Sequence, residues 1–302
     1  MNSDESDDPP KWFTIAPAYG PLDSPPPAPL VTVDFGARSR RGSLRPVNDD
    51  NYLVLRLGRH EETLLTSIPV DEVPTRFDEF GYAMVVADGL GRSGETASRL
   101  AIATLVHLAL YFGRWNLRVD EPIAEEIMDR AKRFYRSVNA ALLEVNRGAD
   151  TPLQSTMTAV FSAGPDVFYT HVGHSRAYLF RDERLVQLTH DHTLERGQPG
   201  QPIMVDVSSS TRDLHHFVTQ SLGGSGMGAS RIDIERFGLL HHDILLLCTN
   251  GLSDVINDEQ IAAVLRTPIT PDDQARVLVD LAADAGGKDD TTALVAHYRI
   301  PS

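Results

Sequence analysis

The chain has 302 residues, of which 41% are hydrophobic and 23% charged, a composition typical of a soluble globular protein that can bury a core. Its net charge is −14, from 28 basic and 42 acidic residues. That balance argues against nucleic acid or an anionic membrane as the main partner, because both bind basic surfaces. No segment approaches the roughly 18 apolar residues of a membrane span. We expect a cytoplasmic monomer whose single cysteine, Cys248, is a buried structural thiol.

The first 30 residues are acidic and hold eight of the 19 prolines. Such a composition cannot bury a core, so residues 1–30 are predicted to be a disordered N-terminal extension. Residues 31–302 are predicted to form one domain.

Apolar runs predict strands at 31–35, 52–57, 63–68 and 82–87. Apolar residues that recur every three or four positions then predict helices at 95–111 and 121–146. After Gly148 strands return at 156–162, 167–172, 177–180 and 185–188, and the last two are predicted to form a hairpin.

Residues 190–230 are polar and rich in Gly, Pro, Ser and His, which indicates either a mobile flap or an ordered surface loop. Further strands are predicted at 231–237, 243–249 and 292–299, with helices at 257–266 and 271–284. Strands dominate both ends of the chain and do not alternate regularly with helices. This order favours an α+β fold with antiparallel sheets over a doubly wound one.

Oxygen-bearing side chains stand at four strand ends that are far apart in the sequence. They are Asp49 and Asp50, Asp88 beside Gly89, Asn250 and Asp254, and Asp289 and Asp290. One cluster of such hard ligands would suit magnesium or manganese rather than zinc. Arg45, four residues before Asp49, is either a bidentate phosphate ligand beside this cluster or a solvated surface residue.

The order of the motifs resembles that of the metal-dependent protein phosphatases of type 2C, the PPM family, in their bacterial form. The segments that carry the resemblance are RPVNDDNY (45–52), VVADGLG (85–91), GETASRLA (94–101), STMTAVFSAG (155–164), THVGHSRAYLFRDERLVQLTHDHT (170–193), VTQSLG (218–223), LLLCTNGLSDV (245–255) and KDDTTALV (288–295). The resemblance implies two antiparallel β-sheets packed as a central sandwich flanked by helices, an α-β-β-α arrangement. It also implies a phosphoprotein substrate, hydrolysed at phosphoserine or phosphothreonine by a water that bridges two Mn²⁺ or Mg²⁺ ions.

By position, the resemblance assigns Asp88 as the carboxylate that bridges the metals and Arg45 as the phosphate ligand. The other implied metal ligands are Asp49, Gly89 through its carbonyl, Asn250 and Asp289. The residues that surround the two metal ions, or that form a third-metal region, would include Asp50, His174, Asp254 and Asp290.

Four positions depart from the family pattern. Leu90 stands where animal members carry a histidine proposed as general acid, and Asp49 replaces a longer glutamate. His174 and Asn250 each replace an aspartate, which removes two of three carboxylates from the third-metal region. We therefore expect two metals rather than three, the second bound weakly.

Three other functions compete with this hypothesis. Gly173 to Ala177 loosely match the nucleophile elbow of serine hydrolases, which requires a helix to follow the serine. His190-Asp191-His192 suggests a His-Asp metal phosphohydrolase. The main alternative is a pseudophosphatase, or phosphoprotein-binding module, with a metal site weakened by Asn250 and His174. The sequence leaves open the substrate protein, its kinase and the choice between Mn²⁺ and Mg²⁺.

Overall fold

A computed structural model describes residues 31–43, 46–58, 63–67, 69, 80–114, 119–193, 218–224 and 232–300. The expected N-terminal extension, Arg45 and most of the 190–230 segment lie outside these ranges.

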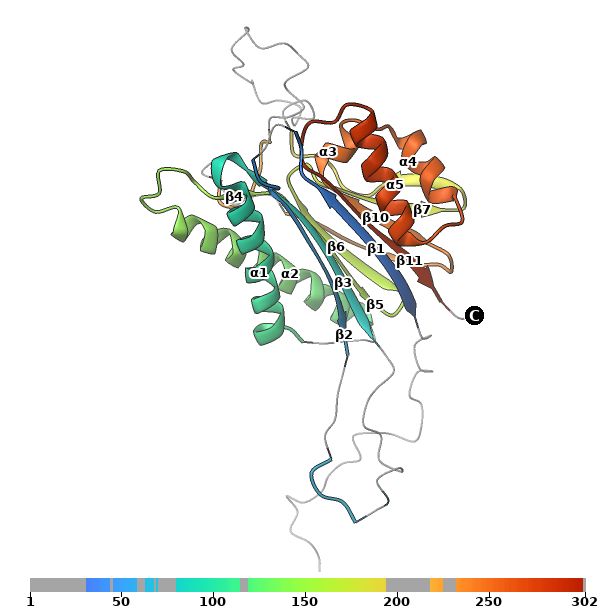
Figure 1. The fold of residues 1–302 in the computed structure, drawn as a ribbon. Helices are drawn as coiled ribbons and strands as arrows, with labels where there is room; N and C mark the ends of the chain where they lie inside the picture. Colours follow the sequence, from blue (N-terminus) through green and yellow to red (C-terminus); the bar gives the residue numbers. More distant parts are fainter. Residues whose placement is uncertain are drawn as a thin grey trace, which may run out of the picture.

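Two antiparallel sheets form the centre of the molecule (Figure 1). The first has the order β1-β11-β10-β7-β8, and the second has the order β2-β3-β5-β6-β9, with β4 paired to the end of β3. The strands of the first sheet are β1 (Thr32–Arg40), β11 (Thr291–Arg299), β10 (Ile244–Cys248), β7 (Arg176–Arg181) and β8 (Arg184–Gln187). Those of the second are β2 (Asp50–Leu57), β3 (Gly81–Leu90), β4 (Gln154–Ser155), β5 (Met157–Ala163), β6 (Asp166–Val172) and β9 (Asp233–Gly238).

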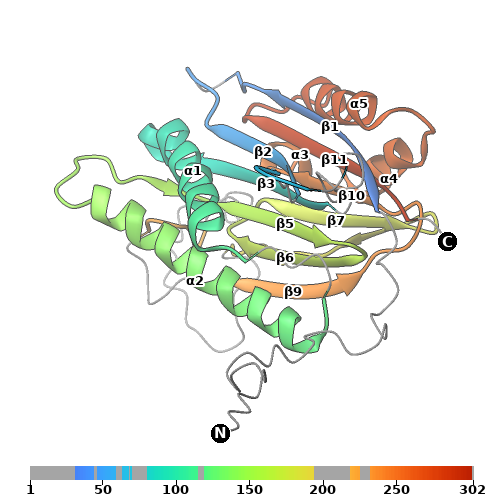
Figure 2. The same cartoon turned by 90° about the horizontal axis from the view of Figure 1, so that it is seen from below.

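Helices cover the outer face of each sheet (Figure 2). On the second sheet lie α1 (Gly94–Phe112), which follows a 3-10 turn at Gly91–Ser93, and α2 (Glu121–Val145). On the first lie α3 (Asn250–Ser253), α4 (Asp258–Arg266) and α5 (Pro271–Asp284). None of these helices is long and apolar enough to cross a membrane. The α+β sandwich predicted from the sequence is confirmed.

The period of two along the strands divides the core into layers. In β10, Leu245 and Leu247 face the other sheet, whereas Leu246 and Cys248 pack against α4 and α5. Burial raises the pKa of the Cys248 thiol to about 12, which keeps it protonated. A third apolar cluster joins α1 and α2 to the outer face of the second sheet.

The predicted strand at 63–68 is wrong for the residues the structure describes. Residues 63–67 form no strand, and the side chains of Leu64 and Leu65 are 80% and 95% exposed. β-branched and apolar residues favour a strand only where a partner strand and a buried face are available. The sequence analysis also missed α3, a single helical turn.

The strand ends that carry the predicted ligands meet at one end of the sandwich. Asp50, the first residue of β2, pairs with Asp88 near the end of β3. In the other sheet, the end of β10 lies beside the start of β11, because Cys248 pairs with Ala293. Antiparallel pairing therefore gathers segments that are far apart in sequence, such as those of Asp49 and Asp290, which are 241 positions apart.

A buried polar network holds the turn between β6 and β7 at this same end. Gly173 has φ 113°, and a Cβ there would lie 2.5 Å from the Thr156 side chain, so the turn requires glycine. The N–H of Gly173 donates to His192 Nδ1 at 3.2 Å, which leaves the proton of His192 on Nε2, 3.1 Å from Asp233. Arg176 binds Asp191 through two nitrogens, with Nη2 2.6 Å from Oδ2.

His171 is a buried titratable member of this network. It is fully buried, and its ring nitrogens lie 2.8 Å from Thr158 Oγ1 and 3.1 Å from the His190 carbonyl oxygen. Burial, and then the neighbouring His192, lower the pKa of His171 to about 3. Below its ordinary pKa of 6.5, only the unfolded chain gains this proton, so folding stability falls as the pH drops.

We expect the His171 imidazole to lower the unfolding free energy by up to about 2 kcal/mol as the pH falls from roughly 7 to 5. In His171→Asn, urea unfolding at the two pH values should show a smaller difference than in wild type. His190→Asn, at an exposed imidazole in the same segment, is the matched control and should keep the wild-type difference. An unchanged pH dependence in His171→Asn would contradict the assignment.

Candidate active site

Asp88 lies at the centre of the predicted site, near the end of β3. Asp88 is 8% exposed, and both its backbone N–H and its backbone carbonyl are hydrogen-bonded. The Asp88 N–H donates to Thr156 Oγ1 at 3.0 Å, and its carbonyl accepts from the N–H of Thr156 at 2.8 Å and the hydroxyl of Ser155 at 3.1 Å. These bonds fix the backbone from which the Asp88 side chain extends.

Gly89 brings the start of α1 against the end of β3. A Cβ on Gly89 would lie 1.9 Å from the Gly94 carbonyl oxygen, so no other residue fits without a backbone shift. The Gly89 N–H donates to the carbonyl of Asp49 at 3.1 Å. The three segments that meet here are thus held by backbone contacts.

Asp49 is buried, and one of its carboxylate oxygens accepts the Glu95 N–H at 2.9 Å, in the first turn of α1. A carboxylate at a helix N-terminus is stabilised by the unpaired N–H groups there. The Asp49 carbonyl also accepts from the Ser98 hydroxyl at 2.6 Å. The predicted ligand Asp49 is therefore at the site, but one oxygen is bound to the helix.

Asp290 anchors the loop that precedes β2. Its carboxylate is 2% exposed and accepts two backbone N–H groups, from Gly42 at 2.6 Å and from Asp49 at 2.7 Å. Asp289 is half-buried beside it, and its Oδ1 accepts the N–H of Asp290 at 3.0 Å. The adjacent carboxylates thus differ in their contacts.

Asp50 joins the two sheets below the site. Its Oδ2 accepts hydroxyls from Thr249 and Thr292, each at 2.7 Å, while Oδ1 is buried with no hydrogen-bond partner in the described part of the chain. Burial, reinforced by Asp290 and Asp289, raises the pKa of Asp50 to about 7.

Asn250 begins α3 at the end of β10 and is 5% exposed. Its Nδ2 donates to Asp254 at 3.3 Å, which orients the amide. The carbonyl oxygen, Oδ1, is buried and accepts no hydrogen bond from any described residue. A buried acceptor without a donor costs free energy, and a cation would satisfy it. This orphaned oxygen fits a metal ligand.

His174 lies in the turn after β6, with its Nε2 3.9 Å from Asp88 Oδ2 and a side chain that is 7% exposed. A nitrogen ligand is thereby placed beside the central carboxylate. Among the described residues, however, no three Asp, Glu, His or Cys side chains converge closely enough to form a metal site by themselves. The amide of Asn250 and the carbonyl of Gly89 are oxygen donors outside that set.

Two competing functions are not supported. Ser175 is fully buried, its hydroxyl lies 2.7 Å from Thr156 Oγ1, and the strand β7 follows it, so it forms no nucleophile elbow. The residues of His190-Asp191-His192 do not face one centre, because Asp191 binds Arg176 and His192 binds Asp233.

Sequence reasoning missed several contacts of the site. The hydrogen bonds from Gly42 and Asp49 to Asp290, and the ion pair of Arg176 with Asp191, join residues with no local pattern between them. Arg45, the predicted phosphate ligand, lies outside the described residues.

The different roles of Asp289 and Asp290 can be separated by measuring the unfolding free energy of variants at each position. Asp290→Ala removes two hydrogen bonds to a buried charge, and we expect it to lower the unfolding free energy by about 3 kcal/mol or more in urea titrations without metal. Asp289→Asn, the neighbouring change, should cost less than about 1 kcal/mol. Equal losses in the two variants would contradict the anchoring role of Asp290.

Comparison with known proteins agrees with this arrangement. No family model matches the chain. The chain is 30% identical over 272 residues to the serine/threonine protein phosphatase PstP of Mycobacterium tuberculosis. The aligned region covers 88% of this chain but only 45% of PstP. It is 28% identical over 222 residues to the serine/threonine phosphatase stp of Listeria monocytogenes, covering 71% of this chain and 83% of the relative.

The fold matches the crystal structure of the catalytic domain of PstP in complex with two manganese ions. The TM-score is 0.64 at 27% identity, over 89% of this chain and 99% of the other. The order of the strands, the gathered strand ends and these relatives lead to one conclusion. The chain belongs to the bacterial type 2C, or PPM, family of serine/threonine phosphatases.

Proposed function

We propose that this protein is a metal-dependent phosphatase that hydrolyses phosphoserine and phosphothreonine in protein substrates. The observation that carries the proposal is the buried, orphaned Oδ1 of Asn250, at the end of the sandwich where Asp88 and Gly89 also lie. A bound cation would satisfy such an oxygen, and PstP, a relative, has been solved with two manganese ions.

The donors at this end are of the type that binds hard divalent cations. Asp88, Asp49, Asp289, the Gly89 carbonyl and Asn250 would hold two Mn²⁺ or Mg²⁺ ions. When bound, these ions would neutralise charge on the phosphoryl oxygens and lower the pKa of a water molecule.

The protein's own residues orient the site and limit its proton chemistry. Thr156 and Ser155 fix the backbone of Asp88, and Asp290 fixes the backbone of Asp49. Leu90, at the end of β3, has no proton to give, so the leaving serine or threonine oxygen would take its proton from solvent. Phosphate binding by Arg45 stays a prediction.

A pseudophosphatase is the second candidate, favoured by the amide of Asn250 and by His174 beside Asp88. Both residues lower the negative charge of the site relative to a carboxylate. In this case the protein would bind phosphoproteins without turnover.

Hydrolysis by the purified chain separates the two candidates. With manganese, wild type should hydrolyse p-nitrophenyl phosphate and a phosphothreonine peptide, and Asp88→Asn should lose at least about a hundredfold of that rate. Asp120→Asn, at the N-cap of α2, is the matched control and should keep wild-type activity. If wild type and Asp88→Asn are equally inert at every manganese concentration, the protein is a pseudophosphatase.

The prediction that the second metal binds weakly is tested by replacing Asn250 with a charged aspartate. A charge pair at about 4 Å and an effective dielectric of 20 is worth roughly 4 kcal/mol, an upper figure because the carboxylate must also be desolvated. We expect Asn250→Asp to tighten manganese binding at least about tenfold in calorimetry. Asn257→Asp adds the same charge at the N-cap of α4 and should leave the affinity unchanged. Unchanged or weaker binding in Asn250→Asp would refute the role of this residue.

A further inference from the structure

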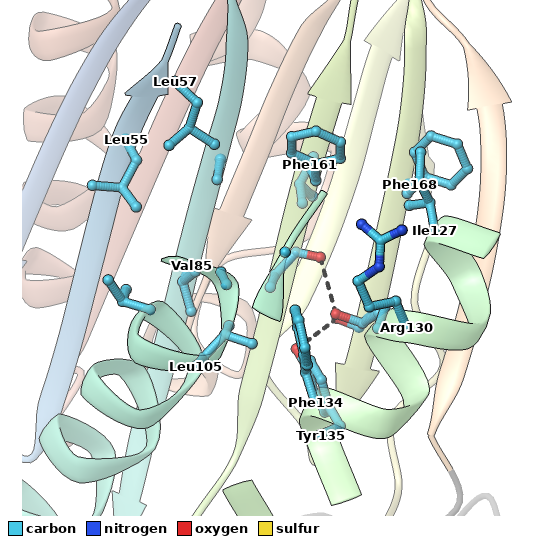
Figure 3. Close-up of a pocket in the computed structure, with 18 of the residues that line it drawn as sticks. Leu55, Leu57, Val85, Leu105, Ile127, Arg130, Phe134, Tyr135, Phe161 and Phe168 are labelled. Atoms are coloured by element: carbon cyan, nitrogen blue, oxygen red, sulfur yellow. Dashed lines mark hydrogen bonds between the residues drawn. The ribbon is translucent and has the colours of Figure 1, made fainter. Parts of the chain in front are cut away.

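A cavity of about 160 Å³ lies between α1, α2 and the outer face of the second sheet (Figure 3). Its walls are mainly apolar, with side chains such as Leu55, Val85, Leu105, Phe134, Phe161 and Phe168. None of the predicted site residues lines the cavity, so it is separate from the candidate active site. An apolar cavity of about 150 Å³ is large enough to hold a benzene ring.

Small side chains make room in both walls of the cavity. The sheet contributes Ala83 of β3 and Ala159 of β5, and the helices contribute Ala109 of α1 and Ala131 of α2. The same elements place larger apolar side chains in the lining, such as Phe134 of α2. A ring of benzene size between the two walls would therefore contact apolar carbon on the sheet side and on the helix side.

The neutral polar groups of the lining already have partners. The Tyr135 hydroxyl donates to the carbonyl oxygens of Met157 at 3.5 Å and Thr170 at 3.4 Å. The Thr170 hydroxyl donates to the Ala159 carbonyl oxygen at 3.5 Å. Neither hydroxyl has a proton left to donate to a ligand.

The two arginines of the lining are paired as well. Arg130 is 8% exposed, its Nη1 donates to the Arg114 carbonyl oxygen at 2.9 Å, and its Nη2 lies 2.7 Å from Glu126 Oε1. Arg114 Nη1 lies 3.4 Å from the same carboxylate oxygen, and the Arg114 side chain is 75% exposed. A charged or strongly polar ligand would lose hydrogen bonds to water here without gaining comparable ones. The cavity therefore selects a neutral ligand.

The cavity reaches the molecular surface at the C-terminal end of α1. Gly113, the residue that ends this helix, and Arg114, with its exposed side chain, both line the cavity. The three residues before Gly113 are Leu110, Tyr111 and Phe112, which are 58%, 72% and 65% exposed. A small apolar molecule can therefore approach the cavity along an apolar surface.

We propose that this cavity binds a small neutral aromatic molecule of about one ring. Its volume and apolar walls fit such a ligand, and the alanines of both walls leave space for it. Phe161 and Phe168, whose ring centroids lie 6.5 Å apart, add aromatic neighbours for the ring. The bound molecule would extend the apolar cluster that joins α1 and α2 to the second sheet.

The proposal is tested with toluene and with phenol, a probe of similar shape that carries a hydroxyl. In methyl NMR titrations of wild type, toluene should shift cavity methyls such as those of Leu55, Val85 and Leu105. Phenol should bind at least about tenfold more weakly, because burying its hydroxyl costs hydrogen bonds to water. Toluene should also raise the melting temperature, since it binds the folded chain. Neither readout uses phosphatase activity, so failure here leaves the proposed function untouched.

Two variants of α2 provide a matched pair. Ala131→Leu should fill the cavity, weaken toluene binding at least about tenfold and remove the effect of toluene on the melting temperature. Ala140→Leu makes the same change at an exposed alanine and should bind toluene as wild type does. If Ala131→Leu fails to fold, the wild-type titrations and the location of the shifts still decide the question. Shifts outside the cavity, equal affinity for the two probes, or binding unchanged by Ala131→Leu would overturn the proposal.

Discussion

One carboxylate holds the two sheets together at the end where the site lies. Asp50 begins a strand of the second sheet, yet it accepts hydroxyls from Thr249 and Thr292, at the ends of two neighbouring strands of the first. Thr249 is followed directly by Asn250, and Asp50 is preceded by Asp49. The position of both predicted ligands therefore depends on this contact between sheets.

Two further carboxylates, those of Asp289 and Asp290, act on Asp50 at this end of the molecule. Asp50 itself has a pKa raised to about 7 by burial, with Asp289 and Asp290 adding to the effect. The Asp290 carboxylate accepts hydrogen bonds from two backbone N–H groups, and these bonds offset the free-energy cost of burying its charge. Asn250 lacks a charge, but its side-chain carbonyl oxygen is buried and has no donor among the described residues. Several carboxylates and the buried Asn250 oxygen thus lie at the same end of the sandwich.

Much of the fold could be predicted from local pattern. The apolar stripe of α2, the period of two in β10 and the Pro271 start of α5 each follow rules that operate within a few residues. The same rules failed at 63–67, where the exposed Leu64 and Leu65 have no partner strand in the described part of the chain.

The site was predictable in part, for a different reason. Asp88-Gly89 and Asp289 stand at strand ends, which the sequence marks. The anchoring contacts of Asp290 could not be predicted, because they join residues 241 and 248 positions apart. The direction of the Asn250 amide also escaped prediction, since it depends on the position of Asp254 one turn later.

The pair of His192 with Asp233 has a consequence for how this fold can diversify. It joins the segment that follows β8 to the start of β9, with the two side chains 3.1 Å apart, and between them in the sequence the described residues 218–224 return to the second sheet, where Leu222 pairs with Ser155. Once two ends are clamped, doubling the length of the chain between them costs only about 0.6 kcal/mol of closure entropy. Added length that leaves the buried Leu222 in place therefore costs little closure entropy. The fold can take on a new surface beside the site while the sandwich that supports it stays unchanged.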